Sequence, residues 1–548
     1  MYRWMNIMFK KKFSFVTLFV LLVAGIGIGT QLNLISGDNI YDQLGKFKDV
    51  LSYTQKYYVD EVDTQKLVES AISGMLKTLD PHSVYIPPKQ LEKVQEDFKG
   101  SFEGIGIEFN VLHDTLTVVS PIFDGPSEKV GILAGDKIIA IDGVSCIKIS
   151  NEDVQKKLRG QKGTQVKVAI LRAGVKDQLA FTIVRDKIPL YSVDTSFLID
   201  DGIGYISVNR FAQNTHQEFV DALRALKAKG MKKLVLDLRQ NPGGYLDQAY
   251  RMSNQFLKQG FMVVNTKGRR PEFDETLTAK GSGEFQNVPL IVLISNSSAS
   301  ASEIVAGAIQ DHDRGLIVGE TSFGKGLVQR QFDLADGSAF RLTTARYYTP
   351  SGRLIQRAYR SGESEEDYYK EAYSRDESDS VNIMHTAEGS KTAKGDSLRP
   401  QFKTDGGRTV YGGGGITPDY IVKAGRLTEY AAKLRPRVFE FTSGFMDQNG
   451  PALRNKYPKN AVDQFITNYQ ISDDMLQSFI DHGTKNKVEF NKEQFEKDKK
   501  WIAFLLKSQI ARTLFGNEGY FKSFLEVDNQ FQKAITLFHE AAKIADLK

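Results

Sequence analysis

The sequence predicts a multidomain protein that combines α/β and α+β architecture. Its 548 residues exceed the roughly 250–300 residues beyond which one hydrophobic core rarely grows, so we expect about three or four domains. Residues 99–186 contain short β-type runs separated by turns, whereas residues 187–360 alternate strand-like and helix-like segments. Residues 38–98 and 426–548 carry helical periodicity. Hydrophobic residues make up 41% of the chain, which is typical of a globular protein.

The N-terminal segment, residues 1–37, predicts a membrane anchor or a signal peptide. Arg3 and the lysines at 10–12 precede an apolar run over residues 13–24 that continues to residue 29. Positive charge before an apolar segment sends the following chain across the membrane. Ala24 is the only alanine here, so no A-x-A cleavage site is present. We therefore favour a single-pass anchor over a cleaved signal peptide. Both place the rest of the chain on the periplasmic, or extracytoplasmic, side of the inner membrane.

Residues 38–98 form the first predicted helical region. Leu44, Phe47 and Leu51 recur near helical spacing, and residues 67–75 continue the pattern. The stretch 79–83 contains a proline and interrupts the helix.

Residues 99–186 are expected to form a compact, mostly β module. Its predicted strands cover residues 105–109, 116–119, 137–141, 166–171 and 178–183. A short helix over residues 151–158 is expected to begin with Asn151 as its cap.

Residues 187–425 are expected to form a layered α/β core. The predicted strands are 233–238, 290–294, 315–318 and 340–347, and the predicted helices are 216–229 and 301–310. Residues 361–407 are polar and poor in aliphatic residues, which predicts a surface insertion, and residues 412–419 return to the core. The helical residues 426–548 have amphipathic faces. Such faces indicate one of two roles. They bind a partner or a second copy of the chain, or they form a helical cap on the core.

Charge and motif content exclude several function classes. The net charge of +5 arises from 72 basic and 67 acidic residues, and so small an excess does not indicate nucleic-acid binding. The single cysteine, Cys146, can form neither an intrachain disulfide nor a C-x-x-C metal pair. The H-E-x-x-H and G-x-S-x-G motifs are absent. We therefore expect no metal and no cofactor.

Two segments carry the residue types of an oxyanion site and a nucleophile. A buried strand ends in Asn-Pro-Gly-Gly at 241–244, where glycines free backbone N–H groups to bind an anion. A second strand runs into the small residues 295–302 and then a helix. A serine there lies at the helix N-terminus, whose dipole favours developing negative charge. Ser/Ala runs are also ordinary helix starts, so the serine pattern alone leaves that interpretation open.

A third segment, residues 320–329, offers a base. Lys325 lies between two glycines after a strand. A lysine acts as a general base only if burial or a neighbour lowers its pKa from about 10.4 towards about 7–8. The alternatives are a phosphate-binding loop and an exposed turn lysine, and the G-x-x-x-x-G-K-[ST] spacing of the first is missing. His312 is a rival base that falls on the far side of the predicted helix from the serines, so we prefer Lys325.

Together the three segments resemble the tail-specific, or carboxyl-terminal processing, serine protease family. That family has a strand ending in N-P-G-G, then S-A-S-A-S-E-I, then F-G-K-G with a glutamine four residues after the lysine. All of these occur here in order. The resemblance implies a crotonase-like protease core in which Ser300 is the nucleophile, Lys325 is the base and Gln329 supports the lysine.

The same resemblance implies further roles. The oxyanion donors would be the N–H groups of Gly243 or Gly244 and of Ala301, and Asp311 would be a structural or supporting residue. One geometric tension arises, because on an extended strand residues 325 and 329 would lie about 13 Å apart. Their contact requires a bend, which Gly326 could supply.

The β module resembles a PDZ domain. Residues 103–109 look like its carboxylate-binding loop and following strand, and residues 125–138 are its most recognisable run. In such a domain, N–H groups of a Gly-rich turn bind a terminal carboxylate, and the peptide adds a strand to the sheet edge. The implied peptide site comprises Gly104, Ile105, Gly106, Ile107, Val154 and Leu158. Core packing is the alternative for Val154 and Leu158, and a tight turn is the alternative for the glycines.

The expected function is a serine endopeptidase of the cell envelope that recognises protein substrates with free apolar C-termini. The C-terminal helices are candidates for binding an adaptor or for self-association. The alternative is a PDZ scaffold with a silent core, against which the intact Ser300, Lys325 and Gln329 argue. An acyl-CoA enzyme on the same layered core is disfavoured because acyl-CoA is cytosolic and this chain carries an export signal.

Overall fold

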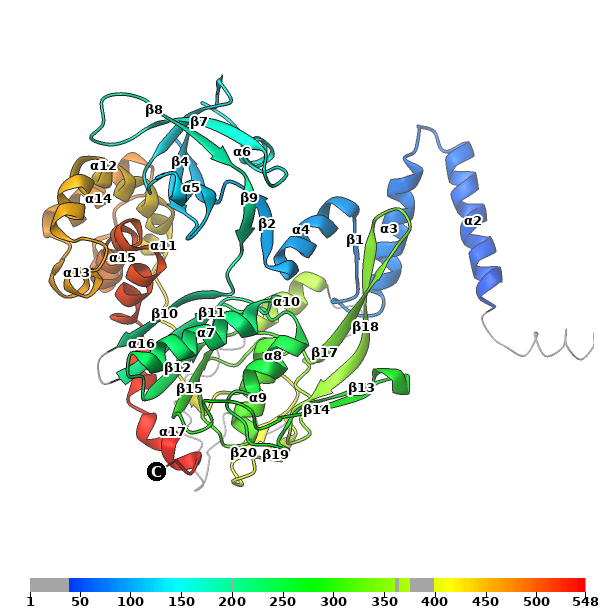
Figure 1. The fold of residues 1–548 in the computed structure, drawn as a ribbon. Coiled ribbons are helices and arrows are strands. Elements are labelled where there is room, and N and C mark those ends of the chain that lie inside the picture. The colour runs from blue at the N-terminus through cyan, green and yellow to red at the C-terminus, as the bar shows by residue number, and fades with distance from the viewer. Residues whose placement is uncertain (1–38, 200–201, 360–363, 375–398, 548) are drawn as a thin grey trace, which may run out of the picture. The chain divides into compact units, whose positions relative to one another are not determined.

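The computed structural model describes residues 39–199, 202–359, 364–374 and 399–547 (Figure 1). The predicted membrane segment, residues 1–37, lies outside these ranges. Of the helices within them, none is both long and apolar enough to cross a membrane. The chain divides into two compact units, one ending at Leu79 and the other beginning at Asp80.

The first unit contains two helices within its described residues, α2 (Ile40–Tyr57) and α3 (Thr64–Lys77). The side chains of Asn39 and Asp63 cap these helices by accepting hydrogen bonds of 3.1 and 3.0 Å from first-turn N–H groups. The predicted helices are therefore confirmed. No residue of α2 is buried, so its apolar residues, including Leu44 and Phe47, remain exposed.

The second unit begins with strand β1 (Val84–Ile86) and helix α4 (Pro88–Lys99). Gly100 ends α4 in the left-handed region, with φ +68°, where glycine is favoured. A β module follows, in which strand β2 (Ser101–Gly104) pairs with β9 (Asp186–Pro189).

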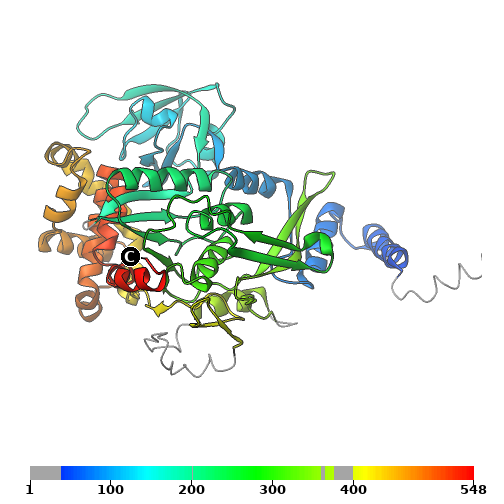
Figure 2. The ribbon, with the colours of Figure 1, turned by 60° about the horizontal axis from the view of Figure 1, so that its bottom comes forward.

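The main sheet of the β module has the order β3-β4-β5-β7-β8, with β6 paired to β5. Its strands are β3 (Ile107–Leu112), β4 (Thr115–Pro121), β5 (Lys137–Ile141), β6 (Val144–Ser145), β7 (Gln165–Leu171) and β8 (Leu179–Val184). With the short helices α5 (Pro126–Lys129) and α6 (Asn151–Leu158), this sheet encloses its own apolar core. The module accordingly forms a separate lobe, coloured cyan in Figure 2.

Ser150, rather than Asn151, caps helix α6. The Ser150 side chain accepts a hydrogen bond of 3.1 Å from the Asp153 N–H, and its backbone is extended. The predicted asparagine cap is therefore wrong by one residue. Serine and asparagine are equally good caps, so two adjacent candidates cannot be separated by residue type alone.

A six-stranded sheet forms the layered core, in the order β10-β11-β12-β15-β16-β21. Its strands are β10 (Val193–Ile199), β11 (Ile203–Val208), β12 (Lys233–Asp237), β15 (Leu290–Ile294), β16 (Leu316–Gly319) and β21 (Tyr420–Ile421). All neighbours are parallel except β10 and β11. Helices α7 (Thr215–Ala228), α8 (Leu246–Ser253) and α9 (Ala301–Asp311) cover one face. The continuously apolar strands fit a sheet that is buried on both faces, and the predicted α/β core is confirmed.

A second sheet has the order β1-β18-β13-β14, with β17 paired to β18. Its further strands are β13 (Met262–Gly268), β14 (Glu275–Thr278), β17 (Leu327–Asp333) and β18 (Ala339–Tyr348), with a 3-10 turn at Pro271–Phe273. Strands β17 and β18 are antiparallel with a register shift between Val328 and Gln329. These two strands carry side chains to the site described below.

The predicted polar insertion, residues 361–407, is partly built into the fold. Helix α10 (Glu365–Ser374) buries Tyr368 in a cluster with Phe323 and Ala299. Strand β19 (Gln401–Lys403) pairs with β20 (Thr409–Tyr411). Residues 375–398 lie outside the described residues. Most described residues of α10 and β19 are exposed, as expected of a surface segment. Tyr368 and Ala372 are the exception, because they bury apolar area that the polar composition of the whole segment conceals.

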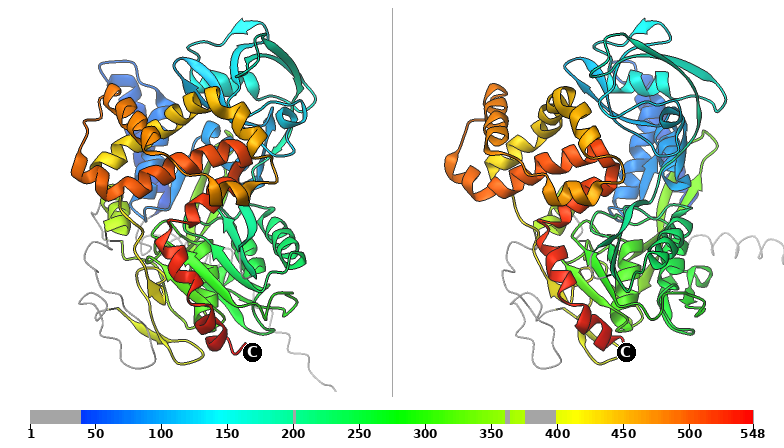
Figure 3. Two further views of the ribbon diagram at one scale, coloured as in Figure 1. Left: turned by 90° about the vertical axis from the view of Figure 1, so that its left-hand side faces the viewer. Right: turned by 60° about the vertical axis from the view of Figure 1, so that its left-hand side comes forward.

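The C-terminal region has two parts (Figure 3). The first is a bundle with its own apolar clusters, formed by α11 (Glu429–Leu434), the turn Arg435–Arg437, α12 (Val438–Lys456), α13 (Val462–Asn468), α14 (Asp473–Lys485) and α15 (Lys492–Leu525). The second part, α16 (Asn529–Ile535) and α17 (Phe538–Ile544), packs on the other face of the six-stranded sheet. These last two helices therefore cap the core, which was one of the two interpretations of this region.

Candidate active site

Ser300 lies at the junction between strand β15 and helix α9. It is the last residue before the helix, and its backbone has φ +55° and ψ −111°, an unusual conformation for a residue with a side chain. Such strain persists only where surrounding contacts fix it, and it is concentrated at functional sites. Helix α9 is completely buried and directs its N-terminus, with its partial positive charge, at Ser300.

The Asn-Pro-Gly-Gly turn packs directly against Ser300. A Cβ atom on Gly243 would lie 2.8 Å from the Cβ of Ser300, so only glycine fits there. The N–H of Gly243 donates to the Asn241 side chain at 2.9 Å. The N–H groups of Gly244 and Ala301, by contrast, have no acceptor among the described residues. The geometry therefore favours Gly244 over Gly243 as the partner of Ala301 in binding an oxyanion.

Lys325 lies in the turn immediately before β17, and its Nζ donates to Gln329 Oε1 at 2.8 Å. Lys325 and Gln329 are not held apart as they would be on an extended strand. Lys325 precedes strand β17, and the register shift between Val328 and Gln329 bends that strand. The Gly326 N–H donates to the side-chain oxygen of Gln356 at 2.8 Å. The predicted contact between lysine and glutamine is therefore present.

The environment of Lys325 favours its neutral form. Burial, followed by the nearby positive charge of Arg341, lowers the pKa of Lys325 from 10.5 to about 8, against the opposing effect of Glu303 and Asp80. The amide of Gln329 is oriented from its other end, because its Nε2 donates to the carbonyl of His82. Its Oε1 must therefore face the lysine. A neutral amine that donates one N–H to Gln329 keeps its lone pair for accepting a proton.

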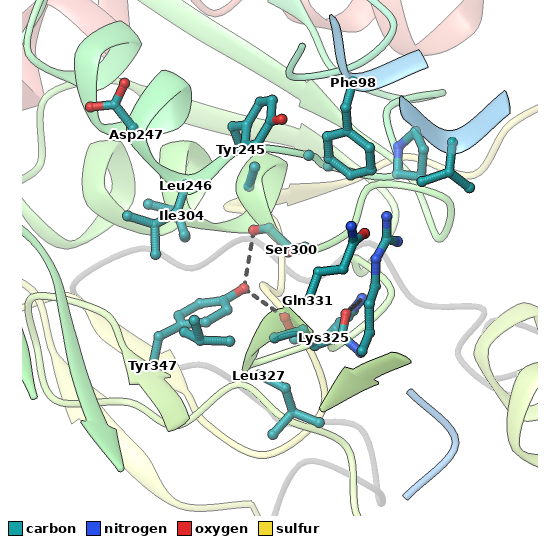
Figure 4. A pocket seen from close by; sticks show the side chains of 18 of the residues that line it. Phe98, Tyr245, Leu246, Asp247, Ser300, Ile304, Lys325, Leu327, Gln331 and Tyr347 are labelled. Atoms are coloured by element: carbon teal, nitrogen blue, oxygen red, sulfur yellow. Dashed lines mark hydrogen bonds between the residues drawn. The ribbon is translucent and has the colours of Figure 1, made fainter. Parts of the chain in front are cut away.

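Two buried side chains, Glu303 and Tyr347, clamp the backbones of Ser300 and Lys325 together. The Glu303 carboxylate accepts from the N–H of Ser300 at 2.7 Å and from the N–H of Lys325 at 3.0 Å. The Tyr347 hydroxyl lies 3.0 Å from the Ser300 carbonyl and 2.7 Å from the Lys325 carbonyl (Figure 4). One acceptor thus binds both N–H groups, and one hydroxyl lies within hydrogen-bonding distance of both carbonyls.

This clamp makes Tyr347 a positioning residue with a measurable effect. In Tyr347→Phe we expect kcat to fall about tenfold, the equivalent of one hydrogen bond, while KM changes by no more than about twofold. Steady-state proteolysis of a reporter substrate measures both constants. Tyr348→Phe removes a hydroxyl from the next residue of β18 and is expected to leave both constants near wild type. An unchanged kcat in Tyr347→Phe would show that the clamp has no part in the reaction.

The predicted catalytic and oxyanion residues converge on one cavity of about 680 Å³. Ser300, Ala301, Lys325, Gln329 and both glycines, Gly243 and Gly244, line it. Helix α4 contributes Val94, Gln95, Phe98 and Lys99, so a segment far away in sequence closes one side. Ser300 Oγ and Lys325 Nζ share the cavity without a direct hydrogen bond, and catalytic hydrogen bonds often tighten only when substrate binds.

Asp311 and His312 lie at the other end of α9, away from this cavity. The Asp311 carboxylate accepts from the Ser351 hydroxyl at 2.7 Å and pairs with the buried Arg353, which fits a structural role. The His312 ring is engaged by Asp405 and the Met262 carbonyl, each at 2.7 Å. The geometry therefore agrees with the preference for Lys325 over His312 as the base.

Three site residues were missed by the sequence predictions: Glu303, Tyr347 and His82. Glu303 stands three residues after Ser300, the S-x-x-E spacing of a capping box, which would have indicated its contact with the serine backbone. His82 packs its ring beside Phe323 and Tyr368, and burial lowers its pKa to about 4. It contributes its carbonyl rather than its ring.

The residues of the predicted peptide site lie together in the β module, although Val154 and Leu158 follow the core-packing alternative. Strand β3 is the edge of its sheet, so one side is open to an added strand. Gly104 lies against the end of α6, since a Cβ there would be 3.5 Å from the Leu158 carbonyl. Gly106 has φ +73°, and Ile107 begins β3. Val154 and Leu158 are buried with Ile105 in the core of the module, so in this structure they pack beneath the loop.

Comparison with known protein families matches four parts of the chain. Residues 202–362 match peptidase family S41, and residues 104–183 match the PDZ domain. Residues 30–89 match the N-terminal domain of the activating protease CtpB. Residues 435–516, within the C-terminal bundle, match a family of unknown function, DUF8443.

Two curated relatives are proteases. The carboxy-terminal-processing protease of Bartonella bacilliformis is 40% identical over 353 residues, which cover 64% of this chain and 81% of that protein. The carboxy-terminal processing protease CtpB of Bacillus subtilis is 37% identical and covers 58% of this chain and 66% of that protein. Among solved structures, the photosystem II D1 C-terminal processing protease is 30% identical, with a TM-score of 0.32, and covers 57% of this chain and 89% of that one.

Proposed function

The chain belongs to the carboxy-terminal-processing serine proteases of peptidase family S41, and we propose that Ser300 is its nucleophile and Lys325 its general base. Its PDZ domain recognises the C-termini of substrate proteins. The observation that carries the assignment of residues is their convergence. Ser300, the lysine with a lowered pKa and the two open N–H groups of Gly244 and Ala301 all border one cavity.

The reaction follows from this arrangement. Neutral Lys325 accepts the proton of the Ser300 hydroxyl, and the oxygen attacks a peptide carbonyl carbon. The N–H groups of Gly244 and Ala301 stabilise the oxyanion. The protonated lysine then gives its proton to the leaving amine, which leaves an acyl group on Ser300. In the second half of the reaction Lys325 accepts a proton from water, and the water oxygen attacks the acyl carbon. The bond from that carbon to Ser300 Oγ then breaks, the lysine returns the proton to Oγ, and the shortened chain is released.

Gln329 orients the base throughout both halves. Its hydrogen bond holds Lys325 Nζ, and the His82 carbonyl holds the amide of Gln329 in turn. Because the glutamine is neutral, it fixes the lysine without raising its pKa as a carboxylate would.

The finer specificity belongs to the same proposal: the PDZ domain reads free, apolar C-termini. The turn at Gly104, Ile105 and Gly106 offers N–H groups for a carboxylate, and the open edge of β3 offers a place for the peptide strand. Val154 and Leu158 lie in the apolar core beneath this turn, and an apolar terminal side chain suits such surroundings.

Location and further partners are also part of the proposal. The basic and apolar segment in residues 1–37 supports an extracytoplasmic location, on a single-pass anchor or after cleavage of a signal peptide. The α11–α15 bundle is the surface we assign to an adaptor or to self-association, since α16 and α17 are already packed on the core sheet.

Dependence on a free tail tests the function as a whole. We expect the purified full-length chain to cleave an unfolded reporter ending in Leu-Ala-Ala, with kcat/KM about tenfold higher for the free tail than for the same tail amidated. The reason is that charge-assisted hydrogen bonds to the terminal carboxylate are lost on amidation. Gel-based cleavage rates for the two reporters measure the ratio.

The alternative, a silent PDZ scaffold, gives a different pattern. It binds the free tail in fluorescence anisotropy with no cleavage of either reporter. Equal cleavage of the free and amidated reporters would support the protease activity but contradict recognition of the free C-terminus by the PDZ domain.

A further inference from the structure

The cavity beside Ser300 has two halves of different chemistry. Figure 4 shows Leu246, Ile304 and Tyr347 on one side of Ser300, and Phe98 and Gln331 on the other. The first half is mainly apolar, although it also includes Asp247, and it suits an apolar residue next to the scissile bond. Phe98 belongs to helix α4, which also brings Gln95 and Lys99 to the cavity, and the Arg341 guanidinium lies over the Phe98 ring, so this half is polar and positively charged.

Arg341 is the unusual member of the second half. It is the third residue of β18, where its neighbours across the strands are Gln331 on β17 and Val84 on β1. Its guanidinium lies over the Phe98 ring, 4.9 Å from the centroid. Within the described residues its side chain forms no hydrogen bond and no ion pair, although it is half-buried. Stacking on an aromatic ring leaves the edge of a guanidinium free to donate in its plane.

Among the residues that the structure describes, no carboxylate pairs with this guanidinium. The acidic residue that lines the same cavity, Asp247, pairs with Arg251 at 2.8 Å and lies on the far side of Ser300 in Figure 4. Lys325, a cation when protonated, is close enough to Arg341 for that positive charge to lower its pKa. A partly buried cation without a partner is costly, and an anionic ligand in the cavity removes that cost.

We propose that Arg341 binds a carboxylate of the substrate on the side of Ser300 opposite the apolar half of the cavity. The enzyme then prefers to cleave where an apolar residue on one side of the bond is combined with a carboxylate on the other. That carboxylate is either an Asp or Glu side chain or the terminal carboxylate of a short tail. This inference rests on the proposed role of the cavity as the site of peptide cleavage, and it adds a specificity-determining residue to it.

The test uses pairs of quenched fluorescent peptides and the full-length enzyme. One series moves a single Glu through the positions flanking an apolar residue, with a matched Gln peptide for each. A second series ends in a free acid or an amide at the same positions. We expect one position at which the acidic peptide has a kcat/KM about tenfold above its neutral match, as a charge-assisted hydrogen bond provides.

Variants then assign the preference to Arg341. In Arg341→Gln we expect the ratio of acidic to neutral substrate to fall to about one, and in Arg341→Lys to recover in part. Because each ratio compares two substrates on one enzyme at one pH, any effect of Arg341 on the pKa of Lys325 cancels. Arg330→Gln is the matched control: Arg330 is exposed on the neighbouring strand β17, stacks on Phe273 and does not line this cavity. Its ratio is expected to stay at the wild-type value.

Two results would overturn the proposal. One is equal kcat/KM for acidic and neutral peptides at every position in the wild type, and the other is a preference that persists in Arg341→Gln. The free-acid series shows whether the PDZ domain causes a preference for a terminal carboxylate. A preference caused by the PDZ domain would persist in Arg341→Gln, whereas one caused by Arg341 would be lost. If no variant cleaves any peptide, fluorescence anisotropy can compare the binding of acidic and neutral peptides to Ser300→Ala and to the double variant that also carries Arg341→Gln. A failure of catalysis can then be told apart from a failure of this inference.

Discussion

Replacing Ser300 with alanine is expected to lower kcat/KM for reporter cleavage by a factor of about 10⁴ or more. Without the Oγ no acyl-enzyme can form, and the N–H groups of Gly244 and Ala301 are left to stabilise only a slow attack by water. The variant should fold, because the change removes at most the capping contact of the Ser300 side chain with the first turn of α9, and the Ser300 N–H keeps its bond to Glu303. Cleavage rates and a thermal melt on the same preparation check both statements.

A neighbouring serine provides the control for this loss. Ser297 precedes the same helix, and its side chain makes only a long contact of 3.5 Å with Asn296, so Ser297→Ala is expected to cleave at the wild-type rate. After incubation with a slowly cleaved peptide, mass spectrometry should detect an acyl adduct on the Ser297→Ala enzyme and none on the Ser300→Ala enzyme. Cleavage by Ser300→Ala at the wild-type rate would remove Ser300 from the mechanism.

Much of the core was predictable because its signals are local. Strands β12 and β15 are each built on a run of consecutive apolar residues, and both fall within one residue of their predicted bounds. The nucleophile, base and glutamine lie on two short segments, so linear motifs were enough to identify them. Lys325 meets Gln329 only through a turn and a register shift, which no periodicity records.

Other parts of the site depend on contacts between distant strands. Tyr347 and Arg341 reach the cavity from β18, and their positions depend on how β18 pairs with β17 and β1. Arg341 also owes its aromatic neighbour to helix α4, which lies more than two hundred residues earlier in the chain. A single sequence carries no local signal for such pairings. The buried end of the polar insertion escaped prediction for a related reason: Tyr368 is buried by Phe323, which lies outside the insertion.

Replacing Lys325 with methionine is expected to lower kcat/KM by a factor of about 10³, the usual contribution of general acid–base catalysis. Methionine keeps the length and the apolar stem but removes the proton acceptor. The variant should be at least as stable as wild type at pH 7, because a buried protonated amine costs free energy that methionine does not. A thermal melt that shows strong destabilisation would mean that the loss of activity reports on the fold instead.

The pH dependence of the wild type separates a base from a mere positive charge. With the pKa of Lys325 lowered to about 8, the neutral amine is the minor form below that pH, so log(kcat/KM) should rise with pH by about one for each unit and level off above it. Lys325→Met should lose this rise.

Lys325→Arg completes the argument, because it retains the charge but cannot be deprotonated near neutral pH. If the lysine acts only by its charge, the arginine variant keeps substantial activity, with a flat pH profile. If the lysine accepts the proton of Ser300, the arginine variant is as inactive as the methionine variant. The second result is the one that we expect, because the groups around Lys325 favour its neutral form: burial and Arg341 outweigh Glu303 and Asp80.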